Sequence, residues 1–180
     1  MNKVELVQTI AHEFRHFGYN ALTLSQIAKV TGLGKASLYH HFPGGKEDMA
    51  IEVLKMARKW IEDELISSLE NVSNTKEKLK IILEKLNTFY DSGKNYCLLD
   101  VMSTGNNSIK ISQEIKMISE SLVVVFKKIA TEAGFSKEKV EIKVHEALCL
   151  IQGALILSRA AQDNKIFKRQ IKHIENNFLL

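Results

Sequence analysis

Proline is almost absent from this chain, and its absence limits the folds that the chain can adopt. Pro43 is the only proline among 180 residues, and there are 9 glycines. A β-sandwich or β-barrel needs many turns, which proline and glycine usually supply. Apolar residues instead recur at spacings of three and four, which is typical of helices that bury one face. The sequence therefore predicts an all-α fold of about nine helices.

Apolar periodicity and capping residues place the helix boundaries. Thr23 and Gln26 match a capping box at the start of the second helix, and Gly18 and Gly32 follow the first and second helices. Pro43 ends the third helix because proline cannot continue it. The first helix carries an apolar stripe of Val4, Val7, Ile10, Ala11, Phe14 and Phe17. The predicted helices cover residues 3–17, 23–31, 35–41, 46–69, 75–92, a short stretch between turns at 93–95 and 105–107, 108–133, 136–161 and 165–178.

Two of these helices form the part of the chain that indicates a function. Residues 23–31 and 35–41 are short helices joined by the turn Gly32–Gly34, which is typical of a helix-turn-helix. In that motif the second helix lies in the major groove of DNA, with its N-terminal side chains near the base edges. A helix as short as 35–41 is unstable alone, so its polar outer face is not explained by folding. From spacing alone, an all-α protein that never binds DNA remains an open alternative.

The segment from Thr23 to Phe42 resembles the N-terminal DNA-binding region of the TetR family of bacterial repressors. The resemblance is carried by Thr23, Ile27-Ala28, Gly32-Leu33, Lys35, Ser37, Leu38, Tyr39, His40, His41, Phe42 and Lys46-Glu47. It implies a helix-turn-helix DNA-binding domain at residues 1–47 and a helical effector-binding and dimerisation domain at residues 48–180. It also implies a regulator, most simply a repressor, that binds a palindromic operator in double-stranded DNA as a homodimer and is released by a small-molecule effector.

The resemblance assigns the DNA contacts residue by residue. Thr23, Ser25 and Gln26 are expected to contact phosphates, and Lys46 is expected to hold a phosphate at the start of the long helix. The groove or its flanking phosphates are expected to be contacted by Lys35, Ala36, Ser37, Tyr39, His40 and His41. The small core of the domain is expected to consist of Ile27, Ala28, Leu38 and Phe42.

Three positions depart from the family pattern. Gly34 stands where the family often has Ser or Pro, and Ala36 stands where it often has Gly. The link from Phe42 to Lys46 is one residue longer than usual, with Pro-Gly-Gly in place of two residues. This linker is similar to that of the subgroup of LmrA- and YxaF-type repressors of multidrug-efflux genes. The longer link leaves the exact placement of Lys46 open.

The family also implies a dimer through the last two long helices and an effector pocket among the middle helices. The dimer stripe is expected to contain Val144, Ala147, Leu148, Ile151, Ala154, Leu155 and Ser158, with Gly153 as a point of close approach, although the same stripe suits an internal core. The pocket is expected to be lined by Trp60, Leu86, Phe89, Tyr90, Met102, Met117, Leu122, Phe126, Cys149 and Gln152, each of which also suits plain core. Such a lining fits a hydrophobic or cationic molecule.

Other functions have less support in the sequence. His12 and His16 are four residues apart, but no HExxH pattern surrounds them, so a surface or packing role is favoured over a metal site. We expect no catalytic residue, metal or cofactor. An enzyme or a helical ligand-binding protein without DNA recognition is the alternative, and the second would leave the polar face of residues 35–41 unexplained.

Charge and cysteine content add little to the assignment. The net charge of +4 is compatible with DNA binding but does not locate a site. Cys97 and Cys149 lie among apolar residues and are expected to be buried thiols, with a redox sensor or a disulfide as the alternative. No segment is apolar enough to span a membrane, so we expect a cytoplasmic protein without a membrane partner.

Overall fold

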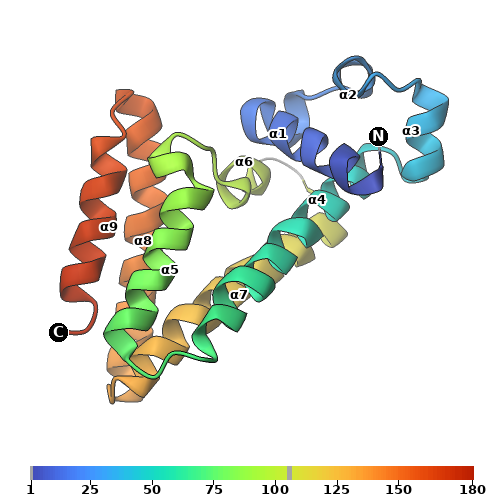
Figure 1. The fold of residues 1–180 in the computed structure, drawn as a ribbon. Coiled ribbons are helices and arrows are strands. Elements are labelled where there is room, and N and C mark those ends of the chain that lie inside the picture. The colour runs from blue at the N-terminus through green and yellow to red at the C-terminus, as the bar shows by residue number, and fades with distance from the viewer. Residues whose placement is uncertain (1, 105–106) are drawn as a thin grey trace. The chain divides into compact units, whose positions relative to one another are not determined.

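The computed structural model describes residues 2–104 and 107–180, which form helices and turns without a β-strand. The expected all-α class and the nine α-helices are confirmed for the described residues. The α-helices are α1 (Lys3–Ala21), α2 (Leu24–Thr31), α3 (Lys35–His41), α4 (Lys46–Trp60), α5 (Thr75–Phe89), α6 (Leu98–Ser103), α7 (Ile109–Glu132), α8 (Lys137–Ala161) and α9 (Lys165–Asn177) (Figure 1). The π-helix η1 (Ile61–Ile66) and the 3₁₀-helices η2 (Ser67–Leu69) and η3 (Asp91–Gly93) complete the chain.

These elements gather into two compact units. The first combines Met1–Lys59 with Leu98–Ile118, and the second combines Trp60–Cys97 with Ser119–Leu180. The unit that contains the helix-turn-helix therefore includes α6 and the start of α7. A compact unit and a functional domain need not coincide, so the functional boundary between residues 47 and 48 stays a prediction.

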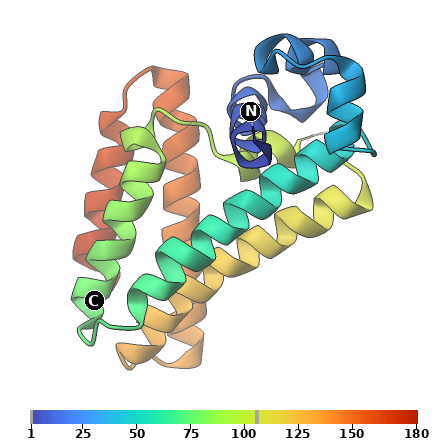
Figure 2. The ribbon, with the colours of Figure 1, turned by 45° about the vertical axis from the view of Figure 1, so that its right-hand side comes forward.

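In the first unit, α1 packs against both α2 and α6, and α2 packs against α3 (Figures 1 and 2). The side chains at its centre are 0–1% exposed and include Leu6, Ile10, Phe14, Leu22, Ile27, Leu38, Phe42 and Met49. The stripe expected on the first helix is correct at its centre and wrong at its ends. Val4 and Phe17 are 64% and 53% exposed, and Leu6 takes the inward position near the start of α1.

The first helix also begins and ends differently from the expected range. Asn2 accepts a hydrogen bond from the backbone N–H of Glu5, and the Glu5 carboxylate accepts one from the backbone N–H of Asn2, which completes a capping box. Gly18 has a φ of 73°, yet it is a kink within α1 and not its end. Helical hydrogen bonding resumes beyond it as far as Ala21.

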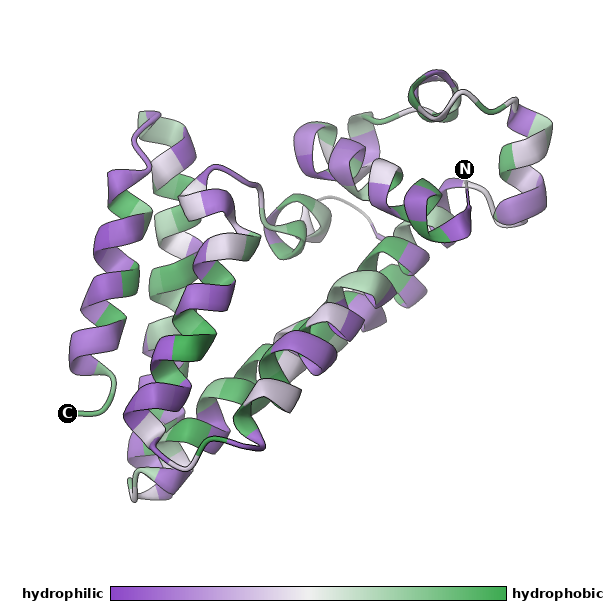
Figure 3. Cartoon of the chain, viewed as in Figure 1, coloured by the Kyte–Doolittle hydropathy of each residue, from purple (hydrophilic) through white to green (hydrophobic). Residues whose placement is uncertain are grey.

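In the second unit, α8 and α9 form an antiparallel pair, and α5 also packs against α9 (Figure 1). Figure 3 shows that α9 is strongly two-sided, with apolar positions on one side and polar positions on the other. Phe167 and Ile174 are buried, whereas Lys168, Arg169 and Lys172 are exposed. The core of this unit is therefore closed by the apolar face of its last helix.

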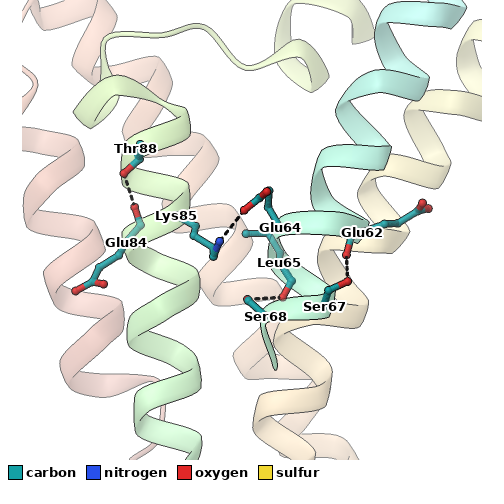
Figure 4. Close-up of polar contacts among 8 residues, drawn as sticks. All are labelled: Glu62, Glu64, Leu65, Ser67, Ser68, Glu84, Lys85 and Thr88. Carbon is teal, nitrogen blue, oxygen red and sulfur yellow. Dashed lines mark hydrogen bonds and ion pairs between the residues drawn. The ribbon is translucent and has the colours of Figure 1, made fainter. Parts of the chain in front are cut away.

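The helix expected over residues 46–69 is not α-helical throughout. The backbone widens into the π-helix η1 and then tightens into η2. Ser67 donates through its hydroxyl to the carbonyl of Glu62 at 3.0 Å, and Ser68 donates to the carbonyl of Leu65 at 2.8 Å (Figure 4). Serine hydroxyls that bond to nearby carbonyls compete with regular α-helical geometry. Such bonds accompany the wide turn, which apolar spacing did not predict.

Two other expected boundaries need comment. The helix expected over residues 75–92 ends at Phe89, because Asp91 and Ser92 have positive φ values of 44° and 55°. The turn expected at 105–107 falls partly on residues 105 and 106, which lie outside the described residues. Within the described part of the chain, no helix combines the length and hydropathy that crossing a bilayer requires.

Candidate nucleic-acid interface

The helix α2 begins with the capping box expected from the sequence. The Thr23 hydroxyl oxygen accepts from the backbone N–H of Gln26 at 3.3 Å, and Gln26 Oε1 accepts from the backbone N–H of Thr23 at 2.8 Å. Neither of these bonds uses the side-chain amide nitrogen of Gln26. Thr23, Ser25 and Gln26 are all exposed, and Gly32 ends α2 in the left-handed conformation. This end of α2 is available to a phosphate backbone.

The helix α3 divides cleanly into an inner and an outer face. Leu38 is 1% exposed, and Phe42, the residue that follows α3, is also 1% exposed. Lys35, Ala36 and His40 are exposed, and Ser37 is half-buried between the two faces. A seven-residue helix is stabilised by packing rather than by its own hydrogen bonds, so these inner contacts hold the polar outer face in place.

Tyr39 projects from α3 beside the linker that follows it. The Tyr39 side chain is 48% exposed. A Cβ atom added to Gly45 would lie 3.3 Å from Tyr39 Cε1, and Gly45 has a φ of +65°. Glycine therefore lets the linker backbone pass close beneath the ring. The Pro-Gly-Gly linker, which is unusual in the sequence, thus supports the position of the Tyr39 side chain.

His41 is placed differently from the other expected contacts. It is half-buried and lines a groove of about 480 Å³ in the first unit, together with Phe42, Pro43, Lys110 and Met117. By helical spacing, Ala36 and His40 share the outer face of α3, while His41 lies toward its side. A DNA contact from His41 is therefore less well supported by the geometry than one from His40.

Lys46 points into the first unit. Its ammonium donates to the backbone carbonyls of Tyr19 at 2.8 Å and Leu22 at 3.0 Å, and it lies 4.6 Å from the centre of the Tyr19 ring. Partial burial lowers the pKa of Lys46, and burial together with the Glu47 carboxylate raises the pKa of Tyr19. The phosphate contact expected for Lys46 has no support in this geometry.

The expected effector-pocket residues are divided between the two compact units. Met102 and Met117 lie in the first compact unit, and the other eight lie in the second. Within the second unit, Trp60 stacks on Phe89 with ring centres 4.0 Å apart, and Phe89 contacts Tyr90 at 5.1 Å. Leu86, Tyr90, Leu122 and Phe126 are at most 5% exposed and Gln152 is half-buried.

Sequence reasoning missed two neighbours of this aromatic cluster. The Tyr90 hydroxyl lies 3.4 Å from Cys97 Sγ, and the Phe167 ring centre is 6.0 Å from that of Tyr90. Phe167 belongs to the apolar face of α9, which helical periodicity predicts. Its contact with Tyr90 was not predicted, because helical periodicity does not relate residues that are far apart in the sequence.

The stripe expected at a dimer interface is part of the core of the single chain. Six of its seven residues, Val144, Ala147, Ile151, Ala154, Leu155 and Ser158, are at most 3% exposed, and Leu148 is half-buried. The alternative that the stripe forms internal core is thus the correct one, because α8 buries this face within its own unit. Cys149 lies on the opposite side of α8 and is exposed, so the expectation that both cysteines are buried is correct for Cys97 and wrong for Cys149.

A second apolar face of α8 remains uncovered in the single chain. Ile142, Ile156 and Leu157 are 53%, 45% and 57% exposed. Gly153 lies on the same face, with nothing within 4 Å of the position where a Cβ would be. Cys149 and Ala160 lie on the same outer face, and the exposed polar residues His145 and Glu146 lie on it between Ile142 and Cys149.

Comparison with known proteins agrees with this geometry. Residues 6–53 match the family model described as "Bacterial regulatory proteins, tetR family". The chain is 27% identical to the HTH-type transcriptional regulator YxaF of Bacillus subtilis (strain 168) over 166 residues, which cover 90% of this chain and 87% of YxaF. It is 23% identical to the HTH-type transcriptional regulator LmrA of the same organism over 170 residues, covering 91% and 89%. Both relatives are described as HTH-type transcriptional regulators.

A solved structure extends the similarity to the whole fold. The TetR transcriptional regulator from Legionella pneumophila superposes with a TM-score of 0.87 at 24% sequence identity. The match covers 98% of this chain and 97% of that chain. The expected fold, an N-terminal helix-turn-helix followed by a helical remainder, is therefore confirmed.

Proposed function

We propose that the chain, whose residues 6–53 match the tetR family of bacterial regulatory proteins, is a transcriptional regulator that binds a palindromic operator through α3 and leaves it when a small-molecule effector binds. The observation that carries this proposal is the two-sided character of α3. Its buried Leu38 joins the core of the first unit, while its outer face presents polar groups to solvent. That arrangement matches a helix that enters the major groove.

The proposed contacts follow from exposure. Lys35, Ala36, Ser37, Tyr39 and His40 face the groove or its flanking phosphates. Thr23, Ser25 and Gln26 contact phosphates from the exposed start of α2. Phosphate contacts fix the orientation of the protein on the duplex, and contacts to base edges select the sequence.

The proposed homodimer uses the outer face of α8 together with α9. An operator with two half-sites requires two recognition helices in one assembly. The exposed residues Ile142, Ile156 and Leu157 supply apolar surface on α8, and the open space beside Gly153 admits a partner helix. The face that the sequence suggested for the interface is already buried within the chain.

The proposed effector site lies in the second unit, around the Trp60–Phe89 stack. Both aromatic side chains are half-buried, which leaves part of each ring accessible. Stacked aromatic rings beside apolar side chains suit a hydrophobic or cationic small molecule. Tyr90, whose ring contacts Phe89, and Leu86 on the same helix as Phe89 extend the proposed lining, whereas Phe126 contacts Phe178 at the other end of α9.

The DNA-binding proposal can be tested without a known operator. The wild-type protein is used to select duplexes from a random library, and the affinity for a selected duplex is measured by fluorescence anisotropy. Tyr39→Ala is expected to weaken binding by about tenfold or more, since a lost contact at each half-site costs about 1–3 kcal/mol. The far-ultraviolet circular dichroism spectrum is expected to stay unchanged.

Phe17→Ala provides the matched control. Phe17 is an aromatic residue of the first unit that is 53% exposed, close to the 48% of Tyr39, and it lies on α1 outside the helix-turn-helix. Its removal is expected to leave the affinity within about twofold. If Tyr39→Ala binds the selected duplex as tightly as the wild type, or if no duplex is enriched, α3 is not the recognition helix.

A further inference from the structure

The backbone carbonyls at the end of α1 lack the donors that an α-helix normally provides. The last carbonyls of a helix have no intrahelical partner and are commonly satisfied by a cation or by a capping residue. The final turn of α1 contains no basic residue, and the residue that follows it, Leu22, is extended. The sequence of α1 therefore leaves its own C-terminal end without a positive charge.

Lys46 supplies that charge from another helix. Its ammonium lies 2.8 Å from the carbonyl oxygen of Tyr19 and 3.0 Å from that of Leu22, which brackets the end of α1. The Tyr19 ring covers a further side of the ammonium at 4.6 Å. A lysine ammonium has three N–H donors, so two of them are already used on carbonyls.

The two hydrogen bonds of Lys46 join segments that lie on either side of the helix-turn-helix in the sequence. Lys46 is 27 residues from Tyr19 and 24 residues from Leu22 in the sequence. The segment between them contains α2, the turn and α3. The ammonium thus ties together the two ends of the helix-turn-helix, at the point where α1 leads into it and α4 leads out.

We propose that Lys46 is a positioning residue, which holds the helix-turn-helix in its DNA-reading geometry by joining α1 to α4 and does not contact phosphate. This inference depends on the proposed function for its consequence, but the clamp itself is a property of the first unit. The lowered pKa of Lys46 agrees with an ammonium withdrawn from solvent.

Salt dependence separates the two roles. A lysine that neutralises a phosphate releases a counterion, and its loss flattens the plot of log affinity against log salt by about 0.9 per contact. Lys46→Met keeps a chain of similar length without the charge. It is expected to lower affinity for the selected duplex about tenfold with an unchanged slope. Lys35→Met, which removes an exposed lysine from the start of α3, is expected to reduce the slope by about 0.9 per subunit.

A chemical measurement on the wild-type protein covers the case in which Lys46→Met does not fold. Lysines are reductively methylated with formaldehyde and borohydride, with and without the selected duplex, and the modified peptides are quantified by mass spectrometry. Lys46 is expected to react slowly in both states, whereas Lys35 is expected to react quickly and to be protected by DNA.

These measurements can overturn the inference in two ways. A slope for Lys46→Met that falls as much as that for Lys35→Met identifies Lys46 as a phosphate ligand. Rapid methylation of Lys46 in the free protein shows that the clamp does not persist. If the wild type enriches no duplex, the proposed function fails, and the methylation rate of Lys46 in the free protein still tests the clamp.

Discussion

The two glycines in the turn of the helix-turn-helix differ in backbone conformation. Gly32 ends α2 with φ 68° and ψ 9°, a left-handed conformation that strains other residues. Gly34, two residues later, precedes α3 with φ −68° and ψ 154°, a conformation open to any residue, and it forms no side-chain cap. At both positions a Cβ would have no neighbouring atom within 4 Å, so packing does not distinguish them. Only backbone conformation does.

Substitution of these glycines is expected to change stability in opposite directions. Gly32→Ala is expected to lower the free energy of unfolding by about 1 kcal/mol, because alanine resists a positive φ. Gly34→Ser is expected to raise it by about 0.5 kcal/mol, because serine caps α3 and reduces the freedom of the unfolded chain. Urea denaturation followed by circular dichroism measures both. Equal effects at the two sites would contradict this account of the turn.

At the scale of elements, an ion pair connects α5 to α7 within the second unit. Lys78 on α5 is only 6% exposed, and its ammonium pairs with the Glu132 carboxylate on α7. The Glu132 side chain is 35% exposed. If the pair is broken, water can therefore solvate the Glu132 carboxylate more easily than the Lys78 ammonium. A buried charge without its partner is far more costly than an exposed one.

The two halves of this ion pair are accordingly expected to respond unequally to mutation. Glu132→Gln leaves the buried ammonium without an anion and is expected to destabilise the protein by about 2 kcal/mol, below the range for fully buried pairs because Glu132 is partly solvated. Lys78→Met replaces the buried charge with an apolar chain and is expected to cost less than about 1 kcal/mol. Thermal or urea unfolding provides the comparison, and a larger loss for Lys78→Met would refute the explanation.

The π-helix η1 shows a limit of sequence analysis at the same scale. Apolar residues continue at helical spacing through this stretch, and Ile61 and Leu65 are both buried as that spacing predicts. The Lys85 ammonium of α5 also reaches the Glu64 carboxylate at 2.7 Å (Figure 4). Because a π-turn keeps residues four apart on nearly the same side, apolar spacing alone does not distinguish it from an α-turn.

At the scale of the whole molecule, α8 has one buried apolar face and one exposed apolar face. One face is buried inside the chain, and the other exposes Ile142, Ile156 and Leu157. Apolar residues on both faces are unusual for a helix that meets solvent on one side. An exposed apolar face of this kind is typical of a protein–protein interface, and a second copy is the occupant that a two-half-site operator requires.

A charge on the outer face of α8 is expected to separate the proposed dimer. Ile156→Arg is expected to give a monomer in sedimentation-velocity experiments, because two like charges would meet near a symmetric contact. Affinity for the selected duplex is expected to fall about 100-fold, since the second half-site no longer adds to binding. Ile109→Arg, at an exposed position at the start of α7, is the control and is expected to remain dimeric. A dimeric Ile156→Arg protein would place the interface elsewhere.

The sequence alone determined the features that depend on neighbouring residues. The Thr23 capping box, the Gly32 helix end and the buried Leu38 and Phe42 follow from spacings of three or four residues, which a helix brings together locally. The proposal that α3 is the recognition helix depends on the same local spacings. The helical class is equally local, since it depends on periodicity and on the scarcity of breakers.

Only the tertiary structure decided the features that join distant segments. The partner of Lys46 lies on α1, the neighbour of Tyr90 lies on α9, and Met102 and Met117 lie in a different compact unit from the other proposed pocket residues. The choice of the buried face on α8 belongs to the same class, because two apolar faces on one helix are equivalent until α9 packs against one of them. Helical periodicity specifies which residues share a face, and long-range packing specifies what that face meets.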